Sequence, residues 1–280
     1  MNIPDENRAY HILSSISYYR LSAYWYTFYQ IPQSEHNFKE GTDFELVYNT
    51  YKFDRKLRVL LFDQIERIEI ALRTQLIYHY CHEYGQNWYE QRDLFRQHSF
   101  YYKFNSLLQD EMKKTSEVFI RHYRDKYTIP ENPPAWMTLE LASFGQLSIL
   151  FKNLRNCRAR KAVANHFGVH PNVLVSWLET LSYVRNSCAH HARLWNRKLP
   201  KPTLWPERTK GIWLKIKPDS DRLNRLYPAL AVTGYLLQRL ATHDAFPEKI
   251  HELLENFPTL PLDYMGFPEN WQDEKLWEIE

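Results

Sequence analysis

Glycine is scarce in this sequence. Only 7 of the 280 residues are glycine, well below the usual share of roughly 7%. Rossmann, P-loop and barrel folds need glycine at their tight turns, and no P-loop, dinucleotide fingerprint or GxSxG elbow is present. The scarcity therefore favours an all-α fold over the nucleotide-binding α/β classes.

Cysteine is also rare, and its spacing does not indicate a set of disulfide bonds. Cys81, Cys157 and Cys188 are odd in number and far apart, which is typical of reduced thiols. No CxxC or HExxH pair offers the spacing of metal ligands. We therefore expect no disulfide, no metal site and no cofactor.

Long apolar runs and an excess of one charge are missing too. No stretch approaches the ~20 apolar residues that span a bilayer, and the first residues do not have the form of an export signal. The formal net charge is only +3, with a pI near 8.6, so any nucleic-acid site must be local. We expect a cytoplasmic protein without a membrane partner.

What the chain does contain is apolar residues at helical spacing. The strongest pattern begins at the capping-box form of Thr42–Glu45 and runs to about Tyr84, ended by Gly85. One interlocked helical domain, 1–280, is expected, because no repeat or flexible linker divides it. Helices are predicted over 5–29, 99–127, 139–150, up to 166, from 171 into 183–190, 221–242 and 246–256, with a loop at 198–218 that holds a short strand at 212–216 and an irregular tail at 257–280.

The highest density of reactive side chains lies between Tyr183 and Arg197. In a continuous helix His190 would lie about 140° around from Arg185. The helix must therefore end near Ala189 if the two side chains are to meet within one chain; otherwise they meet across a dimer. Arg185 should sit at the edge of the buried face, partly desolvated, because apolar residues at helical spacing should face the core: Leu174, Trp177, Leu178, Leu181, Val184 and Cys188.

Arginine and histidine together suffice for RNA cleavage without a metal. An imidazole, whose unperturbed pKa is ~6.5, can exchange a proton with the 2′-hydroxyl or the leaving oxygen near neutrality. A guanidinium can hold two phosphate oxygens and stabilise the charge that grows in the transition state. On residue types alone, a buried Arg–His cluster that ties a helix end to the following loop fits equally well.

A helix-turn-helix pattern overlaps this segment at 162–177, with Gly168 at the turn. As a DNA-binding unit it would present His170, Asn172 and Ser176 to the major groove. A plain helical hairpin is the better interpretation, because the second helix continues into the Arg–His segment and lacks Arg, Lys or Gln at its start. The preceding basic turn is either a phosphate-contacting patch or a solvated turn: Arg155, Arg158, Arg160 and Lys161.

The segment from Arg185 to His191, continued by Arg193–Arg197, resembles the signature of bacterial abortive-infection proteins of the AbiD/AbiF type. These belong to the HEPN superfamily of helical proteins. Several ordered motifs are more specific than one, and together they cover nearly the whole chain. The further segments that resemble family motifs are Tyr18–Trp25, Phe53–Arg58, Pro134–Met137, Ser143–Gly145 and Met265–Pro268.

The resemblance implies a HEPN-type helical bundle, with its core at roughly 40–245 and aromatic N-terminal helices at 5–30. It implies a metal-independent endoribonuclease that leaves a 2′,3′-cyclic phosphate and acts in phage defence or as a toxin. The catalytic residues would be Arg185, Asn186 and His190, with His191 as the alternative histidine. RNA contacts are expected at Arg193, Asn196, Arg197, Arg158, Arg160 and Lys161.

The resemblance also implies partners. Because the chain holds one copy of the motif, two copies would face each other in a homodimer with a composite active site. RNA is the expected substrate, and an antitoxin RNA or protein would be a further partner. A non-catalytic HEPN scaffold that binds RNA or a partner, and a helix-turn-helix DNA-binding regulator, remain as alternatives.

Overall fold

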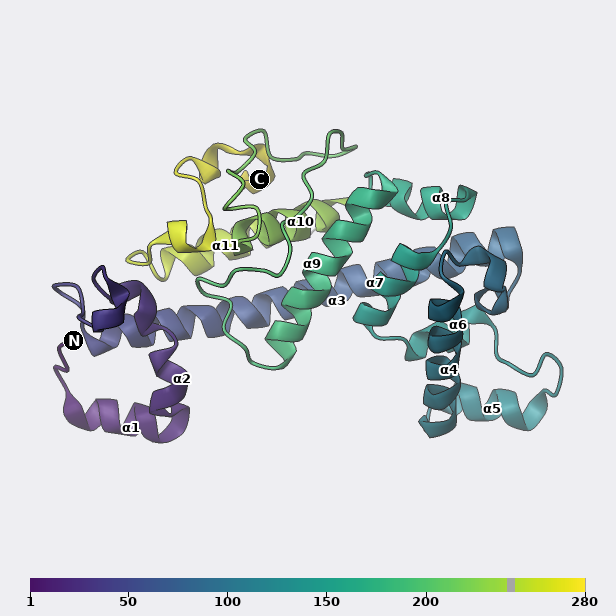
Figure 1. Ribbon diagram of the computed structural model, residues 1–280, viewed down its shortest axis with the longest axis horizontal. Coiled ribbons are helices and arrows are strands. Elements are labelled where there is room, and N and C mark those ends of the chain that lie inside the picture. Colours follow the sequence, from purple (N-terminus) through teal and green to yellow (C-terminus); the bar gives the residue numbers. More distant parts are fainter. Residues whose placement is uncertain (241–244, 280) are drawn as a thin grey trace.

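The longest element of the computed structural model is α3 (Phe44–Tyr84), which runs the length of the molecule with most of the other helices packed along it (Figure 1). The structure describes residues 1–240 and 245–279. The predicted capping box at Thr42 is wrong, because Asp43 supplies the cap by accepting a hydrogen bond from Leu46 N. Gly85 ends the helix at a φ of 87°, where glycine is favoured. The predicted apolar stripe is buried: Leu57, Leu61, Ile65, Ile68, Leu72 and Leu76.

The N-terminal aromatic segment forms two helices, as predicted. α1 (Glu6–Ile16) and α2 (Tyr18–Ser22) meet at Ser17, and a 3-10 turn follows at Trp25–Phe28. Leu21, Tyr24 and Trp25 are buried, so this segment packs onto the start of α3 (Figure 1). Its position matters for the site because α2 reaches the loop that follows α9.

The middle of the chain is more interrupted than predicted. The segment 99–127 is two helices, α4 (His98–Lys114) and α5 (Val118–Lys126), because the chain is extended at Thr115. The helix predicted over 139–150 is likewise α6 (Ala135–Thr138), a 3-10 turn and α7 (Phe144–Asn153). Ser143 starts α7 with a complete capping box.

The predicted hairpin is present as α8 (Arg158–His166) and α9 (Pro171–Ala189), joined through Gly168 at a φ of 70°. α9 packs on α3, α7, α8 and α10, and Figure 1 shows it crossing α3. The predicted inward face of α9 is buried in full: Leu174, Trp177, Leu178, Leu181, Val184 and Cys188.

The C-terminal part folds back over these helices. α10 (Leu226–Arg239) is shorter than the predicted 221–242, of which residues 241 and 242 lie outside the described residues, and α11 (Phe246–Glu255) agrees with its prediction. The strand predicted at 212–216 is wrong. The N–H groups of Lys215 and Ile216 donate to the Glu274 carboxylate, 2.8 Å each, so this backbone is satisfied by the tail instead of a neighbouring strand.

The all-α fold is confirmed: the described residues form helices and three isolated bridges, without a strand. Within these same residues, no helix has both the length and the apolar character needed to cross a membrane.

Candidate active site

The Arg–His motif lies at the C-terminal end of α9. The helix ends at Ala189, where it would have to end for Arg185 and His190 to meet within one chain, and His190 is the C-cap residue. His190 N donates to Asn186 O at 3.0 Å, and His191 N donates to Cys188 O at 3.0 Å. His191 has a φ of 54°, which is uncommon for a residue with a side chain. Both imidazoles are therefore carried on the turn that leaves the helix, and both are exposed.

Arg185 is held by two side chains of α3. Its guanidinium lies over the Phe62 ring at 5.4 Å, and its Nε is 3.8 Å from a Glu69 carboxylate oxygen. It also donates to the Asn186 side-chain oxygen at 3.5 Å. The side chain is 30% exposed, so its predicted place at the edge of the buried face is confirmed.

The two halves of the motif are held by different elements. In the part of the chain that the structure describes, Arg185 has no hydrogen bond or ion pair with either histidine. The carbonyl of His191 instead accepts a hydrogen bond from Arg20 of α2 at 2.5 Å. The Arg193 guanidinium in turn donates to the Ala23 carbonyl at 2.8 Å. Two hydrogen bonds in opposite directions therefore join the end of α2 to the motif loop, the segment 190–197 that follows α9.

A buried carboxylate on α3 fixes the course of the motif loop. Asp54 is fully buried, and one of its oxygens accepts from Leu194 N at 3.0 Å and Trp195 N at 2.7 Å. The other accepts from the Tyr24 hydroxyl at 2.6 Å and from the Arg58 guanidinium. All four groups donate hydrogen bonds to the Asp54 carboxylate. The carboxylate is therefore satisfied in a buried position, where an unpaired charge would be costly.

These contacts act on the protonation of the buried groups in opposite directions. Burial raises the pKa of Asp54, while Arg58, the Tyr24 hydroxyl and the two backbone N–H groups lower it. Burial and the Asp54 carboxylate raise the pKa of Tyr24, so its hydroxyl stays a donor. Asp54, Tyr24 and Arg58 are not among the predicted site residues, although each lies in a segment that carries the family resemblance.

The residues after His191 are engaged within the chain. Asn196 has a φ of 50°, and its side-chain oxygen accepts from Arg225 at 2.7 Å. Arg197 donates to the Ser187 hydroxyl at 3.2 Å and lies over the Tyr183 ring. Together with Arg193, these expected RNA contacts also hold the motif loop in place.

The remaining expected RNA contacts lie at the other end of α9. Arg158 and Lys161 are exposed, whereas Arg160 is 2% exposed and donates from Nε to Phe151 O at 3.4 Å. The structure therefore does not bring this basic turn together with Arg185 and His190. It forms a separate surface near the start of α9.

The helix-turn-helix segment is partly covered by a loop. His170 and Asn172 are exposed, but the Ser176 hydroxyl accepts from Leu204 N at 2.9 Å. The Lys210 N–H likewise donates to Gly168 O at 2.9 Å. A loop laid over this hairpin would have to move before α9 could enter a DNA groove.

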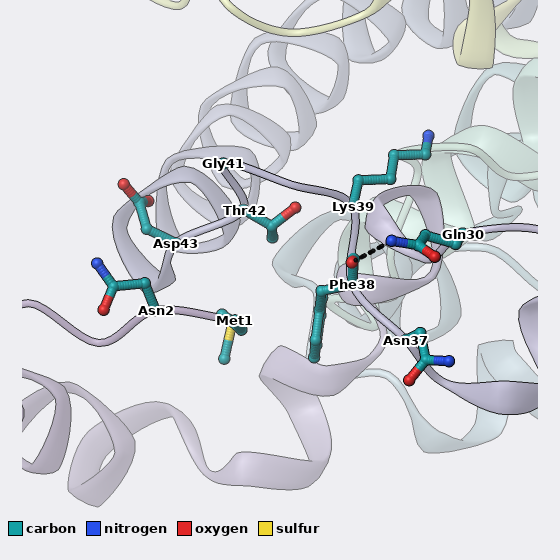
Figure 2. A pocket seen from close by; sticks show the side chains of 9 residues that line it. All are labelled: Met1, Asn2, Gln30, Asn37, Phe38, Lys39, Gly41, Thr42 and Asp43. Carbon is teal, nitrogen blue, oxygen red and sulfur yellow. Dashed lines mark hydrogen bonds between the residues drawn. The ribbon is translucent and has the colours of Figure 1, made fainter.

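One hollow lies beside the predicted site residue Asn186, and another lies near the N-terminus. One of about 390 Å³ runs along α9 from Ser176 to Asn186. The other, of about 510 Å³, lies between the first residues and the 30–43 segment (Figure 2). Its lysine, Lys39, donates to Thr27 O and the Tyr264 hydroxyl, and no predicted site residue lines it. Within the described residues, no three His, Cys, Asp or Glu side chains gather as metal ligands.

The fold and the site define an all-helical protein with an arginine, an asparagine and two histidines at the exposed end of a buried helix. The chain belongs to the family described as Abi-like protein, whose family model matches residues 11–196. That range begins inside α1, ends at Asn196 and includes Asp54, Arg185 and both histidines. The family associates the chain with abortive infection, a form of phage defence. Neither a curated protein nor a solved structure matches the chain.

Proposed function

We propose that this protein is a metal-independent endoribonuclease of the HEPN type, acting in phage defence by abortive infection or as a growth-arresting toxin. The observation that carries the proposal is the end of α9 at Ala189. It leaves Arg185 and Asn186 on the last turns and both histidines just beyond them, on one exposed helix end. Membership of the Abi-like family supports the defence role.

The chemistry requires two proton transfers and one cation. One histidine takes the proton of the 2′-hydroxyl, whose oxygen then attacks the adjacent phosphorus. The bond from phosphorus to the 5′-oxygen breaks, a second histidine protonates that oxygen, and a 2′,3′-cyclic phosphate and a 5′-hydroxyl remain. Arg185 holds the phosphate oxygens, Asn186 orients a reacting group, and His190, supported by His191, transfers protons.

A homodimer supplies the second motif. Within one chain Arg185 is bound to α3 and the backbone of His191 to α2, which fits a site completed by a second copy. Beside Arg185, α3 exposes the Phe62 ring, which is 40% exposed. Val59 and Ile70 are exposed on the same helix, with the charged Asp63 and Glu66 between them, a mixed surface that a second subunit can cover.

The test compares wild-type protein with Arg185→Ala/His190→Ala on single-stranded RNA in EDTA. We expect cleavage by wild type alone, with cyclic phosphates at the 3′ ends of the fragments. The matched control is Arg121→Ala/His122→Ala, an exposed pair on α5, which should cut like wild type. Equal cutting by the Arg185/His190 variant would disprove the site. RNA binding without any cleavage would favour the non-catalytic scaffold.

A further inference from the structure

We propose that a basic pocket at the start of α9, at the opposite end of that helix from His190, binds a phosphate group of the RNA strand. This inference rests on the proposed function, because it supplies the substrate of that site with a second anchor. The pocket has a volume of about 370 Å³ and contains three cationic side chains and no acidic one. Its lining residues are Arg96, Asn156, Arg160, Lys161, His170, Pro171 and Asn172.

Arg160 is a buried cation of this pocket, and a buried charge is normally paired with one of opposite sign. It is 2% exposed and lines the pocket, yet it pairs with no carboxylate of the described residues. Its contacts are the Phe151 carbonyl, bonded through Nε, and the Phe151 ring, 5.1 Å from the guanidinium. Neither of its terminal nitrogens has a hydrogen bond or ion pair in the described part of the chain.

A guanidinium that is largely buried and has no counter-ion is costly to the folded protein. Burial and the nearby Arg96 both lower the pKa of Arg160. The positive charge of Arg96 therefore adds to the cost of keeping Arg160 charged. An anion that enters the pocket removes both penalties. Arginine forks match phosphate oxygens better than a lysine ammonium does, so a phosphate group is the ligand that this arrangement fits.

The surroundings extend the same charge. The pocket opens at the first turn of α9, a helix of 19 residues whose N-terminal end carries a partial positive charge. A cleft of about 870 Å³ adjoins it and shares Lys161, His170, Pro171 and Asn172. That cleft adds Arg208 and Lys210, against a single acidic residue, Glu207.

An RNA strand fits these positions better than a small phosphate compound. α9 is roughly 28 Å long at 1.5 Å per residue, so the pocket and the histidines are separated by a length that a strand can span. The hollow between Ser176 and Asn186 lies along the same helix. A phosphate anchor of this kind holds RNA without reading its bases.

The first test measures RNA binding apart from cleavage. In a His190→Ala background, the affinity for a fluorescent single-stranded oligoribonucleotide is measured by anisotropy over a range of salt concentrations. We expect Arg96→Ala/Lys161→Ala to weaken binding about tenfold and to make the salt dependence shallower, by roughly 0.7 in log–log slope for each lost phosphate contact. Lys113→Ala/Lys114→Ala, an exposed pair at the end of α4, should leave both unchanged.

The second test uses Arg160→Met, which keeps the buried stem and removes the charge. If the arginine is retained for its ligand, the variant should melt at the same temperature as the parent or higher, while its RNA affinity falls. A lower melting temperature with unchanged affinity would show that Arg160 is structural, and would overturn the proposal.

Two further outcomes separate the possible failures. If inorganic phosphate or a mononucleotide raises the melting temperature of the parent but not of Arg96→Ala/Lys161→Ala, while both bind RNA equally, the pocket serves a small phosphate compound and the RNA assignment is overturned. Equal RNA affinity and salt dependence in both proteins, with cleavage by wild type intact, would refute the pocket alone. Binding through the pocket in a protein that never cuts RNA would refute the proposed function alone.

Discussion

At the scale of single residues, Asp54 joins the motif loop to the rest of the molecule. Asp54→Asn keeps the size of the side chain but leaves Arg58 buried without a counter-ion. Breaking one side of a buried ion pair costs on the order of 3 kcal/mol, so we expect a loss of about that size in the free energy of unfolding, measured by urea denaturation. Glu66→Gln, at an exposed position of the same helix, should change it little. An unchanged midpoint for Asp54→Asn would contradict this role.

Cys188 lies between the predicted catalytic residues, but we expect its thiol to be unreactive. It is 5% exposed, and burial raises its pKa to about 12, so the thiolate fraction at pH 8 is on the order of 10⁻⁴. We expect iodoacetamide to leave Cys188 unlabelled in the native protein and to label it after denaturation, as read by peptide mass spectrometry. Rapid native labelling would mean that the end of α9 opens more readily than its packing indicates.

At the scale of elements, the contact between α3 and α8 should make stability depend on pH. Burial lowers the pKa of His79 on α3 and of His166 on α8, and His82 and Arg239 respectively add to the effect. The two histidines therefore bind protons more readily in the unfolded chain than in the folded protein. The free energy of unfolding falls as the pH drops below ~6.5, the histidine pKa in the unfolded chain.

That dependence can be measured between pH 7.5 and 5.5, above the range in which ordinary carboxylates titrate. We expect the free energy of unfolding to be lower at pH 5.5, and the difference to shrink in His79→Gln/His166→Gln. The exposed His98 of α4 provides the control, since His98→Gln should keep the full difference. If the double variant keeps it too, other groups control the effect.

The elements also show where prediction from the sequence stops. Periodicity located α3 and α9, because helical spacing is a local property of the chain. The end of α9 was expected near Ala189 only on the condition that Arg185 and His190 meet within one chain. Periodicity did not divide 99–127, where Thr115 is extended, and it proposed a strand at 212–216 because it could not anticipate Glu274. Glu274 lies 59 positions after Lys215 and 58 after Ile216 in the sequence, so no local pattern could indicate these contacts.

At the scale of the whole molecule, the site depends on contacts that no local pattern contains. Asp54 and Leu194 are 140 residues apart, and Arg20 and His191 are 171 apart. One trace of Asp54 was present in the sequence: it lies three residues before Leu57 and seven before Leu61, on the side of the helix predicted to be buried, where a carboxylate is rarely placed without a partner. The residue types of the motif predicted its chemistry, but only the fold shows that its arginine and histidines are held by different helices.

That separation makes a composite site testable by mixing two inactive proteins. Arg185→Ala and His190→Ala should each fail to cut RNA, because each homodimer lacks one group from both motifs. In a mixed dimer one subunit brings Arg185 and the other brings His190, so if the two act across the interface, cleavage should return after the variants are mixed and allowed to exchange subunits. Sedimentation of differently tagged subunits confirms that mixed dimers form. Mixed dimers that stay inactive would show that one Arg185 and one His190 from different subunits do not make a working site, and would contradict their cooperation across the interface.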